Sequence, residues 1–190
     1  MDSTIRKQLE ITAAKVRMGI IEGTFNAKSG HPGGSLSIAD LLTYLYTVKM
    51  NVNPADPDMK ERDRLVLSKG HTAPALYSVL AEKGFFPKEE LKSLRHIGAL
   101  LQGHPCIHIP GVDMSSGSLG QGISVACGIA LAGKSKIACD KFSNVVPFPF
   151  KTVFKLSMKD CCNNCSVPMF IALIPFSSIL ASGFSLLYFT

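Results

Sequence analysis

A short apolar segment followed by a glycine and a histidine constrains the fold of this 190-residue chain most. Residues 64–68 are Arg-Leu-Val-Leu-Ser, bounded by charged residues on one side and by Gly70 on the other. A short, continuous apolar run is typical of a buried strand in a parallel sheet. His71 then lies just past the carboxyl end of this strand, where ligands bind in open α/β sheets. The segment therefore predicts a parallel sheet with a candidate site beside His71.

Apolar residues recur at helical spacing on both sides of this strand. A helix is expected over residues 3–25, and its apolar stripe, which should pack in the core, comprises Ile5, Leu9, Ala13, Val16 and Ile20. Further helices are predicted over 37–48, with Ser37 as the N-cap, and over 73–83, ending before Gly84. Residues 87–96 and 119–132 complete the set. The last helix is apolar on every side, which predicts that it is buried, with Cys127 as a packing residue.

Three of the five histidines directly follow a glycine, and these are His31, His71 and His104. A histidine in such a turn presents its imidazole on accessible backbone, where it can reach a substrate. Residues 27–35 contain too many helix breakers for a regular element, so a loop is predicted around His31. The alternative is that this loop is a plain connector with His31 as a solvated turn residue.

A glycine-rich loop precedes the last of these helices, over residues 115–122. Glycines allow a close approach between backbone and ligand because they lack a Cβ atom. A loop that runs into the start of a helix also presents unpaired N–H groups, which suit an anion or a polar cofactor.

Composition narrows the classes of partner. The formal net charge of +6 favours an anionic partner, but the basic residues are dispersed and do not alternate with aromatic residues. A phosphorylated small molecule therefore fits the charge, and a nucleic acid is not expected. Residues 1–4 lack the pattern of a signal peptide and the six cysteines show no disulfide framework. A reducing compartment, the cytoplasm, is the prediction.

Four motifs together carry a resemblance to a known family. In chain order they are Ser-Gly-His-Pro-Gly-Gly-Ser at 29–35, Leu-Ser-Lys-Gly-His at 67–71, Gly-His-Pro at 103–105 and Gly-Ser-Leu-Gly-Gln-Gly at 117–122. Over residues 5–134 the chain resembles the thiamine-diphosphate-binding N-terminal half of transketolase. It is most similar to the separate N-terminal subunit of split, two-chain transketolases. Each motif alone is a weak signal, whereas four in register are specific.

The resemblance implies an α/β fold, with a mainly parallel sheet and helices on both faces. It implies transfer of a two-carbon ketol unit from a ketose phosphate to an aldose phosphate, with thiamine diphosphate supplying the carbanion chemistry. The substrates would be sugar phosphates. The site in this family lies between chains, so the expected partner is a transketolase C-terminal subunit or a second protomer.

The resemblance also implies roles for individual residues. His31 and His104 would hydrogen-bond the sugar hydroxyls and assist proton transfer. His71 would lie beside the cofactor, towards its diphosphate. The thiamine end would be contacted by Gly117, Ser118 and Leu119, largely through backbone groups and the leucine side chain.

The chain departs from the family where metal ligands are expected. The family continues into a strand that ends Gly-Asp-Gly-Glu and later supplies an asparagine, and these hold the Mg²⁺ that binds the diphosphate. No Gly-Asp-Gly occurs in this sequence. Asp140 is a lone acid beside lysines, and one aspartate cannot supply the several oxygen ligands of a hard cation. No residue is therefore assigned as a metal ligand, although the family requires Mg²⁺.

Two parts are predicted on this basis, a partial and truncated thiamine-diphosphate-binding domain over 1–134 and a divergent tail over 135–190. Fifteen of the sixteen glycines lie at or before Gly133, and residues 166–190 carry no charge. The tail contains a C-x-x-C pair without histidine partners, which argues against a zinc or redox site. Residues 167–189 suit one membrane span in length, but a proline and several serines make an anchor the less favoured interpretation. The alternative function for the chain is an inactive remnant or interaction module that lacks the metal–diphosphate site.

Overall fold

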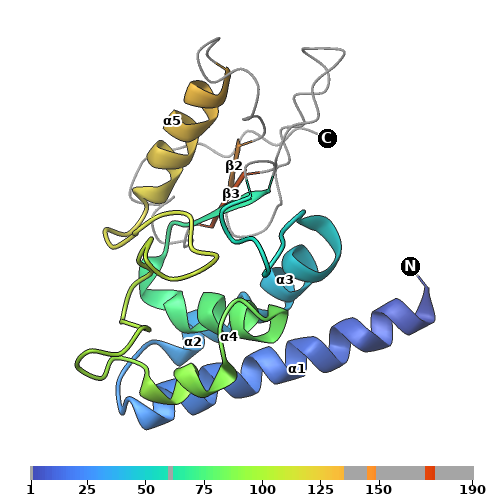
Figure 1. Ribbon diagram of the computed structural model, residues 1–190, viewed down its shortest axis with the longest axis vertical. Coiled ribbons are helices and arrows are strands. Elements are labelled where there is room, and N and C mark those ends of the chain that lie inside the picture. The colour runs from blue at the N-terminus through green and yellow to red at the C-terminus, as the bar shows by residue number, and fades with distance from the viewer. Residues whose placement is uncertain (1, 60–61, 135–144, 149–169, 174–190) are drawn as a thin grey trace.

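Three parallel strands form a sheet in the part of the chain that the computed structural model describes. The strands are β1 (Arg64–Leu67), β2 (Val145–Phe148) and β3 (Phe170–Leu173), in the order β1-β3-β2 (Figure 1). The predicted strand at 64–68 is therefore confirmed, and so is its parallel pairing. The described residues are 2–59, 62–134, 145–148 and 170–173.

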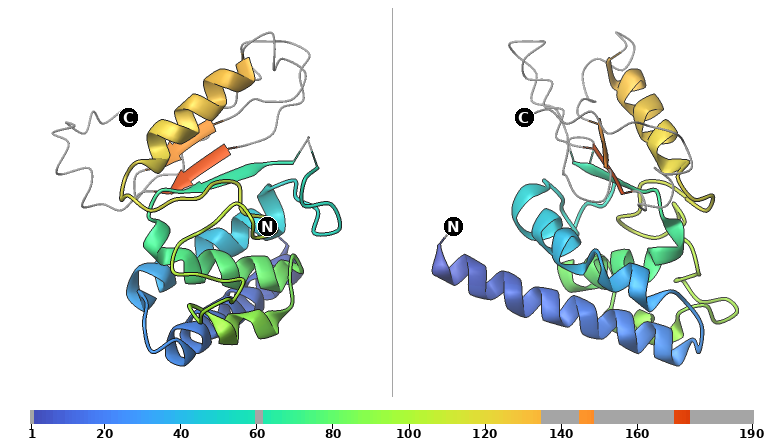
Figure 2. Two further views of the ribbon diagram at one scale, coloured as in Figure 1. Left: turned by 60° about the vertical axis from the view of Figure 1, so that its left-hand side comes forward. Right: turned by 180° about the vertical axis from the view of Figure 1, so that it is seen from behind.

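Helices lie on both sides of this sheet (Figure 2). On one side α5 (Gly122–Lys134) runs along the sheet and contacts all three strands. The other side is covered by a helical layer, with the long α1 (Ser3–Asn26) outermost. Besides α1, this layer contains α2 (Pro32–Leu36), α3 (Ala39–Tyr44), the π-helical turn η1 (Leu45–Lys49) and α4 (Ala73–Lys83). The described elements thus agree with the expected α/β architecture.

The predicted helix at the N-terminal end of the chain is confirmed as α1. A carboxylate oxygen of Asp2 accepts a hydrogen bond from the Thr4 amide at 3.3 Å and caps its first turn. Ala13, Val16 and Ile20 are buried as the apolar stripe predicted. Ile5 is not, with 46% of its surface exposed, because the first turns of α1 extend past the helices on which the rest packs (Figure 1).

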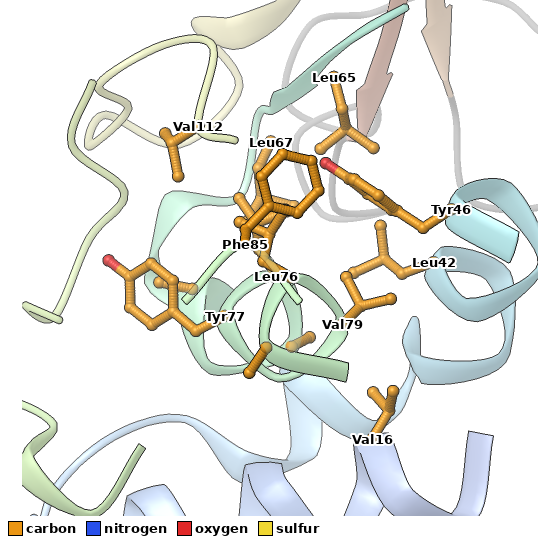
Figure 3. Close-up of a cluster of buried hydrophobic side chains, with 14 of the residues drawn as sticks. Val16, Leu42, Tyr46, Leu65, Leu67, Leu76, Tyr77, Val79, Phe85 and Val112 are labelled. Atoms are coloured by element: carbon orange, nitrogen blue, oxygen red, sulfur yellow. The ribbon is translucent and has the colours of Figure 1, made fainter. Parts of the chain in front are cut away.

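The core lies between β1 and the helical layer (Figure 3). Side chains from β1, α3, η1 and α4 meet there and are almost completely buried. Burial of this apolar surface is the main stabilising contribution to such a fold. Members of the cluster include Leu42, Tyr46, Leu65, Leu67, Leu76 and Val79.

The prediction of an irregular loop over 27–35 is wrong for its last residues. A single helical turn, α2, forms there because Pro32 is its first residue, where a missing N–H breaks no helical hydrogen bond. The predicted cap at Ser37 is also wrong. Ser37 ends α2, and its hydroxyl donates to the carbonyl oxygen of Gly34 at 2.8 Å. The next helix, α3, begins at Ala39 without a side-chain cap.

Two further helices differ from their predicted form. The predicted helix over 87–96 is the short 3-10 helix η3 (Lys88–Ser93), anchored by the buried side chains of Leu91 and Leu94. α5 begins three residues later than expected, after a turn in which Gly120 has a φ of +89°. Cys127 is exposed on α5, so the prediction that it is a packing residue is wrong.

The predictions for the tail mostly fall outside the described residues. This holds for the C-x-x-C pair, for Asp140 and for most of the candidate anchor over 167–189, of which only β3 is described. Among the described helices, none combines the length and the apolar character that a membrane span requires.

Candidate functional site

The candidate site is built on the turn that follows β1. The chain leaves the buried strand at Leu67 and enters the 3-10 turn η2 (Gly70–Thr72), which leads directly into α4. The amide and the hydroxyl of Thr72 both donate to the carbonyl oxygen of Lys69, at 2.9 and 2.8 Å, and close this turn. The structure therefore places His71, which is half-buried, just past the carboxyl end of β1.

The loop before α2 brings a second histidine to the same place. The imidazole rings of His31 and His71 meet edge to face with their centroids 5.0 Å apart. His31 precedes the first residue of α2, and its carbonyl oxygen accepts hydrogen bonds from the amide and the hydroxyl of Ser35. Two motifs that are forty residues apart in the sequence thus share one site, with the His31 side chain exposed.

The protonation state of His71 is set by its surroundings. Partial burial and the nearby positive charges of His31, Lys69 and His104 lower the pKa of this imidazole. The ring is therefore neutral at pH 7, with one nitrogen able to donate a hydrogen bond and the other able to accept one. A neutral imidazole suits both hydrogen bonding to a ligand and proton transfer.

His104 approaches the same site from an irregular segment. Its backbone is fixed by the hydroxyl of Tyr77, which donates to the His104 carbonyl oxygen at 2.8 Å. Burial raises the pKa of Tyr77, so this hydroxyl remains a donor. The side chain of His104 is exposed, and its charge is one of those that act on His71. The three histidines that follow glycines are therefore gathered in one region.

The glycine-rich loop passes directly beside His71. A Cβ atom on Gly70 would lie only 2.6 Å from the carbonyl oxygen of Ser116, so only glycine allows the loop to pack against this turn. The amide of Gly120 donates to the carbonyl oxygen of Ser68 at 3.0 Å. Between these two contacts the predicted cofactor residues Gly117, Ser118 and Leu119 are exposed, with 47% of the surface of Leu119 accessible.

Two buried hydroxyls in this region have no hydrogen-bond partner within the described part of the chain. These are Ser68 Oγ, at the end of β1, and Ser116 Oγ, at the start of the glycine loop. A buried polar atom without a partner carries an energetic penalty, which a bound polar ligand or an ordered water can remove. Neither serine was predicted as a site residue from the sequence.

The two imidazoles, the exposed backbone of the glycine-rich loop and the two unpartnered hydroxyls lie in one part of the structure, and such groups are compatible with a polar ligand. The described residues contain no cluster of three or more histidine, cysteine or acidic side chains that suits a metal. The buried acid Asp113 is committed elsewhere. Its oxygens contact Arg62 at 2.5 Å, Arg64 at 3.2 Å and the Leu65 amide at 2.7 Å, which ties the segment before the glycine loop to β1.

Comparison with known proteins now identifies the family. The thiamine diphosphate binding domain of transketolase matches residues 9–161. The chain belongs to the transketolase family. The match continues past Lys134, so the boundary between a family-like part and a divergent tail stays a prediction.

Two similar transketolases are named as subunits. One subunit of apulose-4-phosphate transketolase, from Phocaeicola vulgatus, is 44% identical over 126 residues, which cover 66% of this chain and 45% of that protein. The 6-deoxy-6-sulfo-D-fructose transketolase subunit SqwG of Clostridium sp. strain MSTE9 is 54% identical over 104 residues, covering 54% and 38%. Among solved structures, Campylobacter jejuni transketolase superimposes with a TM-score of 0.64 at 38% identity, over 70% of this chain and 21% of that one. The chain spans less than half the length of each of these transketolases.

Sequence reasoning missed one charged residue at this site. Lys69 is buried, with 3% of its surface exposed, and its Nζ donates to the carbonyl oxygen of Gly34 at 2.8 Å and to Ser37 Oγ at 3.0 Å. Its position was one signal, because a lysine between a buried strand and a Gly-His turn has little access to solvent. The partners of Lys69 lie more than thirty residues away, so no local sequence pattern predicts these contacts.

Proposed function

We propose that this chain provides the thiamine-diphosphate-binding part of a transketolase-type transferase. The reaction would move a two-carbon ketol unit from a ketose phosphate to an aldose phosphate. The single observation that carries the proposal is the convergence of His31, His71 and the glycine loop after Ser116 at the carboxyl end of β1. Membership of the transketolase family supports the same reaction class.

The chain's own residues would bind the sugar and move its protons. His31 and His104 are exposed and lie on loops, so their imidazoles are free to hydrogen-bond sugar hydroxyls and to take up or release a proton there. His71 is neutral because its pKa is lowered, and it would hydrogen-bond the diphosphate side of the cofactor. In the glycine loop, Gly117 and Ser118 offer backbone groups and Leu119 an apolar surface.

Thiamine diphosphate, when bound, would supply the carbanion chemistry of the transfer. Its ring end would be held by the glycine loop, with the unpartnered hydroxyls of Ser68 and Ser116 as hydrogen-bonding groups close by. Mg²⁺ is expected with the diphosphate, but no ligand for it is assigned within the described residues. The positively charged Lys69, beside His71, adds favourable charge for an anionic group.

A partner chain is part of the proposal. Two similar transketolases carry the word subunit in their names, and this chain spans less than half of either. We expect a transketolase C-terminal subunit, or a second protomer, to complete the site. The cytoplasm is the proposed compartment.

Reconstitution tests the proposal. The full chain is mixed with a C-terminal subunit of a split transketolase, thiamine diphosphate and Mg²⁺, and ketol transfer from a ketose phosphate to an aldose phosphate is followed. His31→Asn and His104→Asn are expected to reduce the rate by at least about a hundredfold, since each removes a proton-transfer group. His108→Asn is the matched control, because His108 is exposed and is not among the groups that shift the pKa of His71.

The outcome separates the two candidate functions. Transfer that depends on His31 and His104 but not on His108 supports the enzyme. A reconstituted complex that assembles but transfers no ketol unit supports the alternative, an inactive remnant or interaction module of the transketolase family.

A further inference from the structure

Among the lysines whose side chains the structure describes, Lys69 alone is buried. Burial removes an ammonium group from water, which is unfavourable unless other groups replace the lost hydrogen bonds. Burial also lowers the pKa of Lys69 to about 8, so the group is still mostly protonated at pH 7. A charge kept in such a place is expected to hold neighbouring groups in position.

We propose that Lys69 is a positioning residue, which clamps the loop that carries His31 onto the turn that carries His71. The inference rests on the proposed function for its consequence, because the two histidines belong to the proposed site. The contacts of Lys69 with Gly34 and Ser37 can be probed in the chain itself, without turnover.

The clamp acts on the end of α2. Lys69 Nζ donates to the carbonyl oxygen of Gly34 and to Ser37 Oγ, and the Ser37 hydroxyl itself donates to the same carbonyl at 2.8 Å. The last carbonyls of a helix have no partner within the helix and carry partial negative charge. An ammonium group placed there satisfies them and stabilises the turn.

The other end of α2 carries His31. The helix is only five residues long, so a restraint at Gly34 and Ser37 is transmitted over one turn to the histidine that precedes it. Gly34 also packs on the opposite turn, where an added Cβ would lie 2.8 Å from Thr72 Cγ2 and 3.7 Å from His71 Nε2. The 5.0 Å contact between the two imidazole rings therefore depends on how α2 is seated.

The connection is needed because the two histidines lie on separate segments. The residues around His71 follow a buried strand and are themselves largely buried, whereas His31 and Pro32 are exposed. Hydrogen bonds to a charged donor are stronger than those between neutral groups. Lys69 thus connects the buried end of the strand to the exposed loop on the other side of the site.

The test compares three variants of the full chain by NMR and by hydrogen exchange. Lys69→Met removes the donor and the charge, and Ser37→Ala removes one partner of the clamp while keeping the lysine. Thr43→Val is the matched control, because it also removes a hydroxyl that makes a hydrogen bond. The buried Thr43 hydroxyl donates to the carbonyl oxygen of Ala39 at 2.8 Å within α3, which is a different helix from the one that Lys69 contacts. The readouts are the ring-proton shifts of His31 and amide exchange in residues 32–37.

Lys69→Met is expected to speed amide exchange in 32–37 by about tenfold or more and to remove the shift that the His71 ring imposes on His31. Ser37→Ala should move both readouts in the same direction by less, and Thr43→Val should move neither. Ser37→Ala decides the matter where Lys69→Met fails to fold. If both clamp variants behave like Thr43→Val, Lys69 does not hold α2 and His31 in position, and the proposal is wrong.

Titration with thiamine diphosphate then separates this inference from the proposed function. If the parent chain binds the cofactor, Lys69→Met is expected to raise the Kd by about tenfold. An unchanged Kd would overturn the role of the clamp in the site. If the parent chain does not bind, the proposed function fails, and the NMR and exchange results still decide whether Lys69 seats His31.

Discussion

The imidazole rings of His31 and His71 lie edge to face at a centroid distance of 5.0 Å, although forty residues separate them in the chain. The contact joins a loop near the N-terminal end of the chain to the turn after β1. It turns two Gly-His motifs into one site, beside which the glycine loop and His104 are placed by their own contacts.

The lowered pKa of His71 predicts a pH dependence of stability. Below its usual pKa of 6.5 the unfolded chain takes up a proton before the folded chain does, so stability decreases as the pH falls through this range. Urea unfolding at about pH 7.5 and about pH 5.5 measures the effect. The parent chain should lose more stability between these values than His71→Asn, and equal losses would show that the pKa of His71 is not lowered.

Close packing at Gly70 predicts a large effect of a single methyl group. In Gly70→Ala the new Cβ would meet the Ser116 carbonyl oxygen at 2.6 Å, so either the turn or the loop must shift, at a cost of about 1–3 kcal/mol. Gly128→Ala is the control, because nothing lies within 4 Å of its added Cβ on α5. Thermal unfolding should show Gly128→Ala stabilised by about 1 kcal/mol, since alanine favours helix. Similar midpoints for the two variants would contradict this.

The ion pairs of Asp113 are buried, so losing them should destabilise the fold more than losing an exposed ion pair. Asp113→Asn leaves Arg62 without its charge partner in a site where both side chains are at most 5% exposed, and it is expected to cost about 3–5 kcal/mol. Asp40→Asn removes an exposed ion pair with Arg17 and should cost about 0–1 kcal/mol. Chemical denaturation of both variants checks the order, and a small effect at Asp113 would show that the pair is solvated.

The unpartnered hydroxyl of Ser116 predicts that the fold tolerates its removal. Because Ser116 Oγ has no partner in the described part of the chain, Ser116→Ala should leave the stability of the chain unchanged or raise it slightly. The same variant is expected to weaken binding of thiamine diphosphate, since it removes a hydroxyl next to the proposed site. A clear loss of stability would indicate that the hydroxyl already has a partner.

The sequence was sufficient for the elements with strong local signals. The apolar run after Arg64 predicted β1, and Gly84 marked the end of α4, where the observed φ of +97° requires a residue without a Cβ. The placement of His71 followed from the rule for ligand sites at strand ends. These features depend on a few neighbouring residues, and that is why they were predictable.

Other features depend on distant contacts and were missed. The turn α2 forms in a breaker-rich segment that Lys69 stabilises from across the site. Cys127 was expected to be buried because α5 is apolar all round, yet one side of this helix faces away from the sheet. The hydroxyl of Ser37 serves α2 rather than capping α3. In each case the arrangement of other segments of the chain decides the local structure.

Calorimetric titration of the full chain with thiamine diphosphate and Mg²⁺, alone and with a transketolase C-terminal subunit, tests the central claim most directly. Saturable binding that weakens in His71→Asn, and not in His108→Asn, is the predicted result. Absence of binding under both conditions would contradict it, and would mean that this member of the transketolase family keeps the site's histidines without its cofactor.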